Sequence, residues 1–412
     1  MFSDYAYASA TSRTLKRYFD WFAACLSAGL ATVGIEEHLG GIRSVSPDDQ
    51  AVFALKDHSD RHFRVLEVAA NDGSLIRALR AQGIDAIGVD PAVNLVHQAQ
   101  SEGLPIVLGT WPESASRVAD FYQEAESAGR IRLKNNGLTG HRYPGFDVIV
   151  CLNVLAHVCQ PLDFLTVCRA HLNPGGVVIV QTSQARMLSR GEFDTCYHEH
   201  VSFFNSYSMH ALAERAGLSI IKTLLVDIHG DSALWFLGAK GAPCLDVSSA
   251  FSVGDFFIDE DLRGFEVSIG VSESNTYESF AEKTQVLIER LRNIVYDYKR
   301  RGHEIVFVGA AAKAITMLHA TGVVPDRLVD EAPLKIDTFP PALDVRVEAL
   351  ASLQTLRRPA LFVISAWNFL DELKRKICAV GVPSQSVFYS YFPSERLVGV
   401  EETFQESFRK AG

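Results

Sequence analysis

The chain has 412 residues, of which 48% are hydrophobic and 21% are charged, and its formal net charge is −10. This length exceeds one ordinary hydrophobic core and predicts two or three globular domains. The acidic balance argues against nucleic acid and anionic membrane as partners, because their phosphate groups carry charge of the same sign. No apolar run approaches the roughly 18 residues that span a bilayer.

Two features indicate a cytoplasmic protein without a bound metal. Residues 22–33 are apolar, but Asp20 interrupts the start of this stretch and Glu36 follows it in place of a cleavage site. We therefore expect a packed helix here and not a signal peptide. The seven cysteines are an odd number and form no C-x-x-C pair, which predicts reduced, buried thiols and no zinc site.

The first half of the chain has the pattern of an α/β fold. Residues 8–30 have the apolar spacing of a helix, and residues 35–60 have the polar composition of a connection. Strands are expected over 64–69, 86–89, 105–108, 146–152 and 176–181, with helices over 73–81, 92–102 and about 162–172. This alternation predicts a parallel, doubly wound sheet. Residues 113–145 lengthen one crossover, and their basic part, 130–142, is interpreted as a surface loop or as a lid over a phosphorylated ligand.

The second half departs from this rhythm and then resumes it. Residues 197–235 are interpreted as an insertion that carries substrate chemistry, and a long helix is predicted over 272–301. From His303 a strand, Gly309, a helix to His319, a strand to Val329 and a strand over 360–364 follow. This second alternation predicts another, smaller α/β domain.

The segment EVAANDGS at 67–74 directly follows the first predicted strand. Methyltransferases usually place an acidic residue here, followed by small residues at every second position, which are Ala69, Asn71 and Gly73 in this chain. Small residues let the backbone N–H groups of the turn approach a cofactor closely. Asn tolerates the left-handed backbone that such a turn needs.

Asp90 closes the next predicted strand, where a carboxylate can accept both ribose hydroxyls of a nucleoside. The same logic serves NAD enzymes, but the chain has no G-x-G-x-x-G motif after this strand. The stretch FDVIVCLNVLAHV at 146–158 and the turn NPGG at 173–176 complete a set of four motifs in methyltransferase order. The predicted cofactor is S-adenosylmethionine, with contacts from Glu67, Ala69, Asn71, Gly73, Asp90, Pro91 and Asn153.

The string GEFDTCYHEHVSFF at 191–204, together with EVAANDG and with FSDYAYASATS at 2–12, resembles the sugar C-methyltransferase family. The resemblance covers nearly the whole chain, including GAAAKAITML at 309–318 and SAWNFLDEL at 365–373. Members methylate carbon in keto-deoxysugar nucleotides with S-adenosylmethionine. The resemblance implies a Rossmann-like class I methyltransferase domain followed by a smaller α/β domain, and a nucleotide-linked keto-sugar as substrate.

Methylation at carbon requires removal of a proton beside a carbonyl, and histidine is the natural base near neutral pH. By the family pattern, His200 matches the base, and Glu199 matches a carboxylate that orients or tunes it. Tyr197, Tyr5 and Tyr7 are expected to line the sugar pocket or to donate to the enolate oxygen.

Three further residues are expected to contact the substrate. His229 matches a family segment in which Asp231 and Leu234 of this chain replace a glycine and a basic residue. Lys313 and Lys335 are candidate anion contacts in the second α/β domain. The chain departs from the family in two other ways: its sequence contains no cysteine-rich zinc domain, and EAPLKIDTFPPALDV at 331–345 replaces an Asn- and Gly-rich stretch.

The predicted organisation has four parts. Residues 1–60 form an N-terminal helical segment that contributes to the substrate pocket, and residues 61–240 form the cofactor-binding domain with its catalytic insertion. Residues 241–301 form a helical connection, and residues 302–412 form a substrate-binding domain. Alternative functions are a C-methyltransferase acting on an acyl or polyketide ketone, an O-methyltransferase, and a non-enzymatic cofactor-binding assembly subunit. The oligomeric state stays open.

Overall fold

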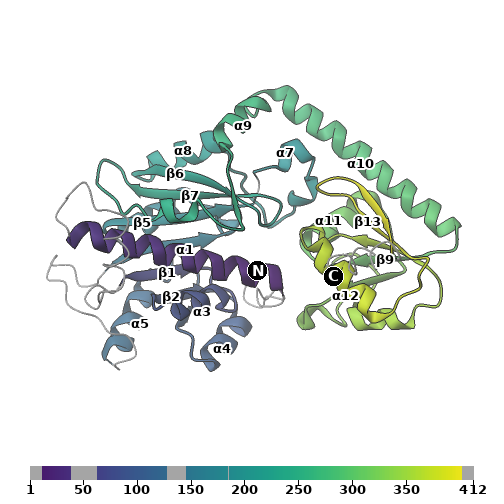
Figure 1. Cartoon of the computed structure of the whole chain (residues 1–412), viewed down its shortest axis with the longest axis horizontal. Coiled ribbons are helices and arrows are strands. Elements are labelled where there is room, and N and C mark those ends of the chain that lie inside the picture. Colours follow the sequence, from purple (N-terminus) through teal and green to yellow (C-terminus); the bar gives the residue numbers. More distant parts are fainter. Residues whose placement is uncertain (1–11, 39–62, 128–144, 184, 401–412) are drawn as a thin grey trace. The chain divides into compact units, whose positions relative to one another are not determined.

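The computed structural model describes residues 12–38, 63–127, 145–183 and 185–400. The chain divides into two compact units. Figure 1 colours the chain by sequence, from purple at the N-terminus to yellow at the C-terminus. Unit 1 comprises residues 1–185 and 201–266, and unit 2 comprises residues 186–200 and 267–412. None of the described helices is long and apolar enough to cross a membrane.

Unit 1 contains an eight-stranded sheet in the order β3-β2-β1-β4-β5-β7-β6-β8. Strands β1 to β5 run parallel, and β7 is antiparallel to both β5 and β6. The strands are β1 (Arg64–Val68), β2 (Asp85–Asp90), β3 (Ile106–Leu108), β4 (Phe146–Leu152), β5 (Leu172–Thr182), β6 (Leu218–Val226), β7 (Ser232–Ala239) and β8 (Phe257–Ile258). The helices are α1 (Arg13–His38), α3 (Ser74–Ala81), α4 (Val93–Ser101), α5 (Ala115–Ser127), α6 (Pro161–Ala170), α8 (Ser206–Arg215) and α9 (Leu262–Ser268), the last of which ends in unit 2.

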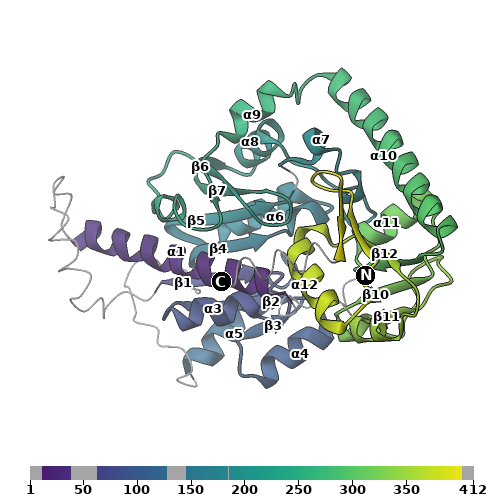
Figure 2. The same ribbon diagram turned by 45° about the vertical axis from the view of Figure 1, so that its right-hand side comes forward.

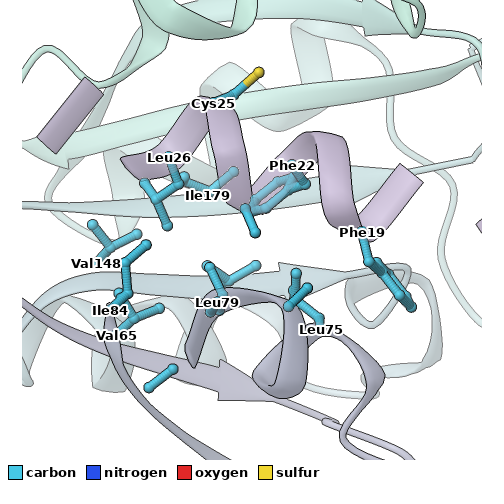
Figure 3. Packing of buried hydrophobic residues seen from close by; sticks show 14 of the residues in the cluster. Phe19, Phe22, Cys25, Leu26, Val65, Leu75, Leu79, Ile84, Val148 and Ile179 are labelled. Carbon is cyan, nitrogen blue, oxygen red and sulfur yellow. The ribbon is translucent and has the colours of Figure 1, made fainter. Parts of the chain in front are cut away.

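Each face of this sheet has its own apolar core, because successive residues of a strand point to opposite faces. Val148 of β4 packs on one face with α1 and α3, whereas its neighbour Ile149 packs on the other with α6 and α8. Figure 3 shows Phe22 and Leu26 of α1 beside Ile179 of β5. Strands buried on both faces explain the continuous apolar runs of the sequence.

Unit 2 contains a six-stranded sheet in the order β11-β10-β9-β12-β13-β14, of which only β14 is antiparallel to its neighbour. The strands are β9 (Glu304–Val308), β10 (Arg327–Asp330), β11 (Val347–Ala349), β12 (Ala360–Ile364), β13 (Val387–Ser390) and β14 (Arg396–Gly399). The helices are α7 (Met187–Arg190), α10 (Ser274–Arg300), α11 (Ala312–Thr321) and α12 (Leu370–Val380). Figures 1 and 2 show α10 as one continuous helix.

The chain reverses its winding direction between β9 and β12, which are neighbours in the sheet. Such a switch point is where open α/β sheets bind ligands, at the carboxyl ends of the strands. In unit 1 the equivalent point lies between β1 and β4. Both sheets are therefore doubly wound, as the two alternating patterns of the sequence predict.

One region differs from the organisation that the sequence predicts. The predicted insertion over 197–235 is wrong for residues 206–235, which contain α8, β6 and the first half of β7. These antiparallel strands extend the unit 1 sheet, so a pattern based on alternating strands and helices does not recognise them. Residues 186–200, within the predicted cofactor domain, belong to unit 2. All seven cysteines are free, but Cys159 and Cys196 are exposed and not buried as expected.

Candidate active site

The turn after β1 carries three left-handed residues at alternate positions. The backbone angle φ is +59° at Ala69, +52° at Asn71 and +74° at Gly73. A Cβ added to Gly73 would lie 2.6 Å from Leu104 Cδ1, so a larger residue would displace this side chain and would also be strained at the positive φ. Asn71 has the left-handed backbone conformation, which asparagine adopts more readily than most residues, as the sequence predicts.

Asp90 ends β2 and holds this turn from the neighbouring strand. Its Oδ2 accepts a hydrogen bond from Asn71 N–H at 2.8 Å, and its Oδ1 accepts one from Ala92 N–H at 2.8 Å. Burial raises the pKa of Asp90, whereas the two N–H groups act in the opposite direction. The carboxylate is thus fixed at the carboxyl edge of the sheet, where ribose hydroxyls bind in folds of this type. Pro91 follows it in the bend before α4.

Glu67 of β1 is a buried carboxylate, and none of the described residues forms a hydrogen bond with its Oε2. Burial raises its pKa well above the ordinary value, and repulsion from Asp72 and Asp90 adds to this shift. A buried acceptor without a donor costs free energy unless a ligand supplies one. The orphan oxygen, the left-handed turn and Asp90 together fit S-adenosylmethionine, which offers hydroxyl and ammonium donors.

The same edge of unit 1 also carries Asn153 and His229. Asn153 directly follows β4 with φ of +56°, and its backbone N–H donates to Gln181 O at 3.1 Å. His229 has φ of +56° in the β6–β7 turn. This turn lies at the carboxyl end of β5, because Thr182 of β5 pairs with Ala233 of β7. The fold therefore brings both residues to the edge that holds Asp90.

The candidate base His200 lies in unit 2, just after the short 3-10 helix Phe193–Thr195. Its Nδ1 is 2.8 Å from Thr195 O, and its Nε2 is 2.8 Å from Tyr197 Oη. A carbonyl oxygen only accepts, so Nδ1 carries the hydrogen and Nε2 of the neutral ring accepts from the Tyr197 hydroxyl. The Tyr197 and His200 rings also pack with centroids 4.1 Å apart.

The predicted role of Glu199 in orienting or tuning His200 stays a prediction. Its Oε1 lies 3.9 Å from Nε2 of the exposed His198, and in the described region the ring of His200 is oriented by Thr195 and Tyr197. The predicted contacts Tyr5 and Tyr7 lie outside the described residues.

Lys313 lies near the start of α11, at the switch point of unit 2. Its Nζ is buried, sits 4.6 Å from the centre of the Trp367 ring, and has no hydrogen-bond partner among the described residues. Trp367 Nε1 in turn donates to Oδ2 of the fully buried Asp194 at 3.0 Å. Burial raises the pKa of Asp194, while the charge of Lys313 acts in the opposite direction. These three residues connect the segment before His200 to the edge of the unit 2 sheet.

Lys335, the second predicted anion contact, is engaged differently. Its Nζ lies 3.1 Å from Asp330 Oδ2, and both side chains are largely buried. The same carboxylate accepts from the N–H groups of Ala310 at 2.6 Å and Ala332 at 2.8 Å. Lys335 therefore neutralises a carboxylate of its own unit, whereas Lys313 has no hydrogen-bonded counter-ion in the described region.

Several buried polar residues near the candidate site are absent from the sequence-based predictions. Asp194 of unit 2 stands inside the quoted string 191–204 and is fully buried, and its apolar neighbour Phe193 was the only local signal of this burial. Gln181 and Tyr18 of unit 1 carried no signal, because each is a single polar residue in a predicted strand or helix. Both are nevertheless buried and joined by a hydrogen bond.

Comparison with known proteins gives two family matches along the chain. Residues 41–223 match a methyltransferase domain family, and residues 260–386 match the C-methyltransferase C-terminal domain. The C-methyltransferase NovU of Streptomyces niveus is 26% identical over 315 residues, which cover 75% of this chain and 67% of that protein. A ubiquinone biosynthesis O-methyltransferase of Xylella fastidiosa is 30% identical over 179 residues, covering 42% of this chain and 64% of the relative.

Among solved structures, a SAM-dependent methyltransferase from Archaeoglobus fulgidus aligns with a TM-score of 0.32 and 12% identity, covering 43% of this chain and 86% of that one. The family matches agree with the Rossmann-like sheet of unit 1 and with a further α/β sheet in unit 2. The chain is an S-adenosylmethionine-dependent methyltransferase with a class I methyltransferase fold in unit 1, and it is related to the C-methyltransferases.

Proposed function

We propose that this methyltransferase removes a proton from the carbon beside a ketone and methylates that carbon, with a nucleotide-linked keto-sugar as substrate. The observation that carries the proposal is the state of His200. Its Nδ1 donates to Thr195 O, so the ring is fixed as the tautomer whose Nε2 lone pair is basic. The relationship to C-methyltransferases supports the same reaction type.

Tyr197 is suited to assist this base. In the structure its hydroxyl hydrogen points to His200 Nε2. When a ketone binds, rotation of the hydroxyl toward the ketone oxygen would release the Nε2 lone pair for the proton on the neighbouring carbon. Tyr197 would then donate to the oxygen on which negative charge develops. Bound S-adenosylmethionine supplies the electrophilic methyl group.

The cofactor residues proposed in unit 1 fill distinct roles. The Asp90 carboxylate would accept from the ribose hydroxyls, and the turn from Ala69 to Gly73 would bring backbone N–H groups close to the ligand. Glu67 would accept from a donor of the amino-acid end through its orphan Oε2. His229 is proposed to contact the substrate from the same edge.

The nucleotide part of the proposed substrate rests on unit 2. The buried ammonium of Lys313 lies at a switch point, and Gly309, four positions earlier in the chain, has a φ of +100°. A phosphate oxygen would supply the acceptor that Lys313 lacks among the described residues. The resemblance to sugar C-methyltransferases names the substrate class, and residues 302–412 are proposed to bind it.

Exchange of the proton beside the ketone with deuterated water tests the base. His200→Ala should exchange this proton about 10²–10⁴-fold more slowly than wild type, because a general base typically accelerates proton transfer by that factor. The exposed neighbour His198 gives the matched control, and His198→Ala should exchange at the wild-type rate. Wild-type exchange should rise with pH over roughly 6–7, where an ordinary imidazole loses its proton. NMR follows exchange without any methyl transfer.

Product analysis completes the test. Mass spectrometry of nucleotide keto-sugars incubated with the enzyme should show a gain of one methyl, and NMR should place it on carbon. A methyl group on oxygen would identify an O-methyltransferase. Methylation of an acyl ketone but of no sugar nucleotide would retain the chemistry and reject the substrate. Unchanged exchange in His200→Ala would remove His200 from the role of base.

A further inference from the structure

A buried hydrogen-bond network in unit 1 joins α1, the residue after β4, the strand β5 and the β6–β7 turn. It lies at the edge of the sheet where the cofactor is proposed to bind. At its centre is Gln181 of β5, which is fully buried. Its Oε1 accepts from the hydroxyl of Tyr18 in α1, and its Nε2 donates to Asn153 Oδ1 at 3.2 Å and to Ser232 Oγ at 3.4 Å. Ser232 Oγ donates to Ile228 O at 2.9 Å.

The direction of every hydrogen bond in this network is fixed from its two ends. At one end, burial raises the pKa of Tyr18 well above 10, so its hydroxyl keeps its hydrogen. Among the described residues, Gln181 is its hydrogen-bond partner, and the buried hydroxyl must therefore meet the oxygen of the Gln181 amide. At the other end, the Ile228 carbonyl only accepts, so Ser232 donates to it and accepts from Gln181.

The orientation of Asn153 follows from these constraints. Gln181 can present only its NH2 group to Asn153, so Asn153 must accept this hydrogen bond with its side-chain oxygen Oδ1. The Asn153 NH2 group is then turned away from the network and donates to none of the described residues. Asn153 also has a left-handed backbone at the end of β4, which fixes the starting direction of its short side chain.

The position of Asn153 indicates which end of the cofactor this donor meets. Asp90 ends β2, and Asn153 follows β4, with β1 between the two strands. Neighbouring strands lie about 4.8 Å apart, so the two residues stand about 10 Å apart across the edge. A cofactor whose ribose is at Asp90 extends across β1 toward β4 with its amino-acid end. That end carries a carboxylate, which needs donors, and an ammonium, which needs acceptors.

We propose that Asn153 donates its NH2 group to the carboxylate of bound S-adenosylmethionine, and that Gln181 and Tyr18 are positioning residues that hold this amide in the donating orientation. The inference concerns the cofactor and is independent of which substrate is methylated. It predicts a defect confined to ligands that carry the carboxylate, whereas a general loss of structure would weaken every adenosine ligand.

Calorimetry with two ligands tests this directly. S-adenosylhomocysteine carries the amino-acid end, and 5′-methylthioadenosine lacks it. Asn153→Asp replaces the donor by an acceptor of the same size and should raise the Kd for S-adenosylhomocysteine roughly 10- to 100-fold, as expected for loss of a hydrogen bond to a charged group. The Kd for 5′-methylthioadenosine should change less than about twofold.

Variants of the network test positioning. Gln181→Glu exchanges the donating NH2 for an oxygen, so Asn153 should turn its own NH2 inward and lose the same ligand preference. Tyr18→Phe, which removes the constraint on Gln181, should give a smaller loss of the same kind. Thr182→Val is the matched control, since Thr182 is the buried polar neighbour of Gln181 but bonds to Trp235 outside the network.

Two outcomes would overturn the proposal. If Asn153→Asp binds S-adenosylhomocysteine as well as wild type or more tightly, the amide does not face the carboxylate. If Gln181→Glu and Tyr18→Phe weaken both ligands equally while remaining folded by circular dichroism, the network supports the fold and does not position Asn153. If Gln181→Glu fails to fold, Tyr18→Phe and Asn153→Asp still decide the question.

Discussion

The two units fix the turn after their first strand in the same way, with an aspartate at the end of the second strand. In each sheet the second strand ends in an aspartate, Asp90 in β2 and Asp330 in β10. Each carboxylate accepts one N–H from the turn after the first strand and one from the residue two positions further along the chain. The aspartate thus ties the ends of the first two strands together beside the switch point of each unit.

The surroundings of the two aspartates differ. In unit 1 the buried carboxylates of Glu67, Asp72 and Asp90 lie close enough for their repulsion to raise the pKa of Glu67. In unit 2, Lys335 forms an ion pair with Asp330, and Lys313 adds a second cation near the turn. The two edges therefore differ in side-chain charge: carboxylates gather at the first, whereas lysines lie beside the carboxylates of the second.

The largest effect expected from this comparison separates the two aspartates. Asp90→Asn should weaken S-adenosylhomocysteine binding by about 1–3 kcal/mol, because buried ribose hydroxyls lose an ionised acceptor. Asp330→Asn is the same change at the matching position of unit 2 and should leave this affinity within about twofold. Calorimetry measures both, and equal losses in the two variants would mean that Asp90 acts only through the fold.

Removal of charge at Glu67 should separate stability from binding. Burial raises the pKa of Glu67, so the folded chain holds this proton more tightly than the unfolded chain does. Wild-type stability therefore falls as pH rises from the ordinary Glu value through the raised one. At pH 8 the free energy of unfolding of Glu67→Gln should exceed that of wild type by about 1 kcal/mol or more. The same variant should bind the cofactor less tightly.

The pH dependence of this difference provides its control. The gain in stability of Glu67→Gln should be small near pH 4.5 and should grow with pH, since the variant has no carboxyl to ionise. Urea denaturation of the cofactor-free protein at several pH values measures it. A gain that is constant across pH, or a loss of stability at pH 8, would show that Glu67 is ionised and compensated in the folded chain.

A further effect distinguishes the two lysines. Lys313→Ala should raise the KM for a sugar nucleotide by about tenfold without changing the Kd for S-adenosylhomocysteine, because a charge-assisted bond to phosphate is lost. Lys335→Ala should change KM less than about threefold, since its ammonium is already paired with Asp330. Steady-state kinetics decides, and a larger effect at Lys335 than at Lys313 would reverse the assignment.

Local sequence patterns predicted much of the fold. The runs around β1, β4 and β12 are short and apolar, and each is followed by a small-residue turn or a polar boundary. The left-handed turn from Ala69 to Gly73 and the aspartate at the end of β2 were predictable for the same reason, because each depends on a few neighbouring residues. The antiparallel strands β6 and β7 were not, since they interrupt the expected alternation.

The sequence by itself determined the two doubly wound sheets, the cofactor turn and the residue types suited to base catalysis, because strand, helix and turn preferences are local. The tertiary structure decided which side chains contact one another and how they are oriented. The tautomer of His200 depends on Thr195, the availability of each lysine depends on its nearest carboxylate, and the direction of Asn153 depends on Tyr18 through Gln181. Tyr18 and Gln181 are 163 positions apart, and Asp194 and Trp367 are 173 apart. Hydrogen bonds over such separations exist only after the chain has folded, so no local pattern of residues encodes them.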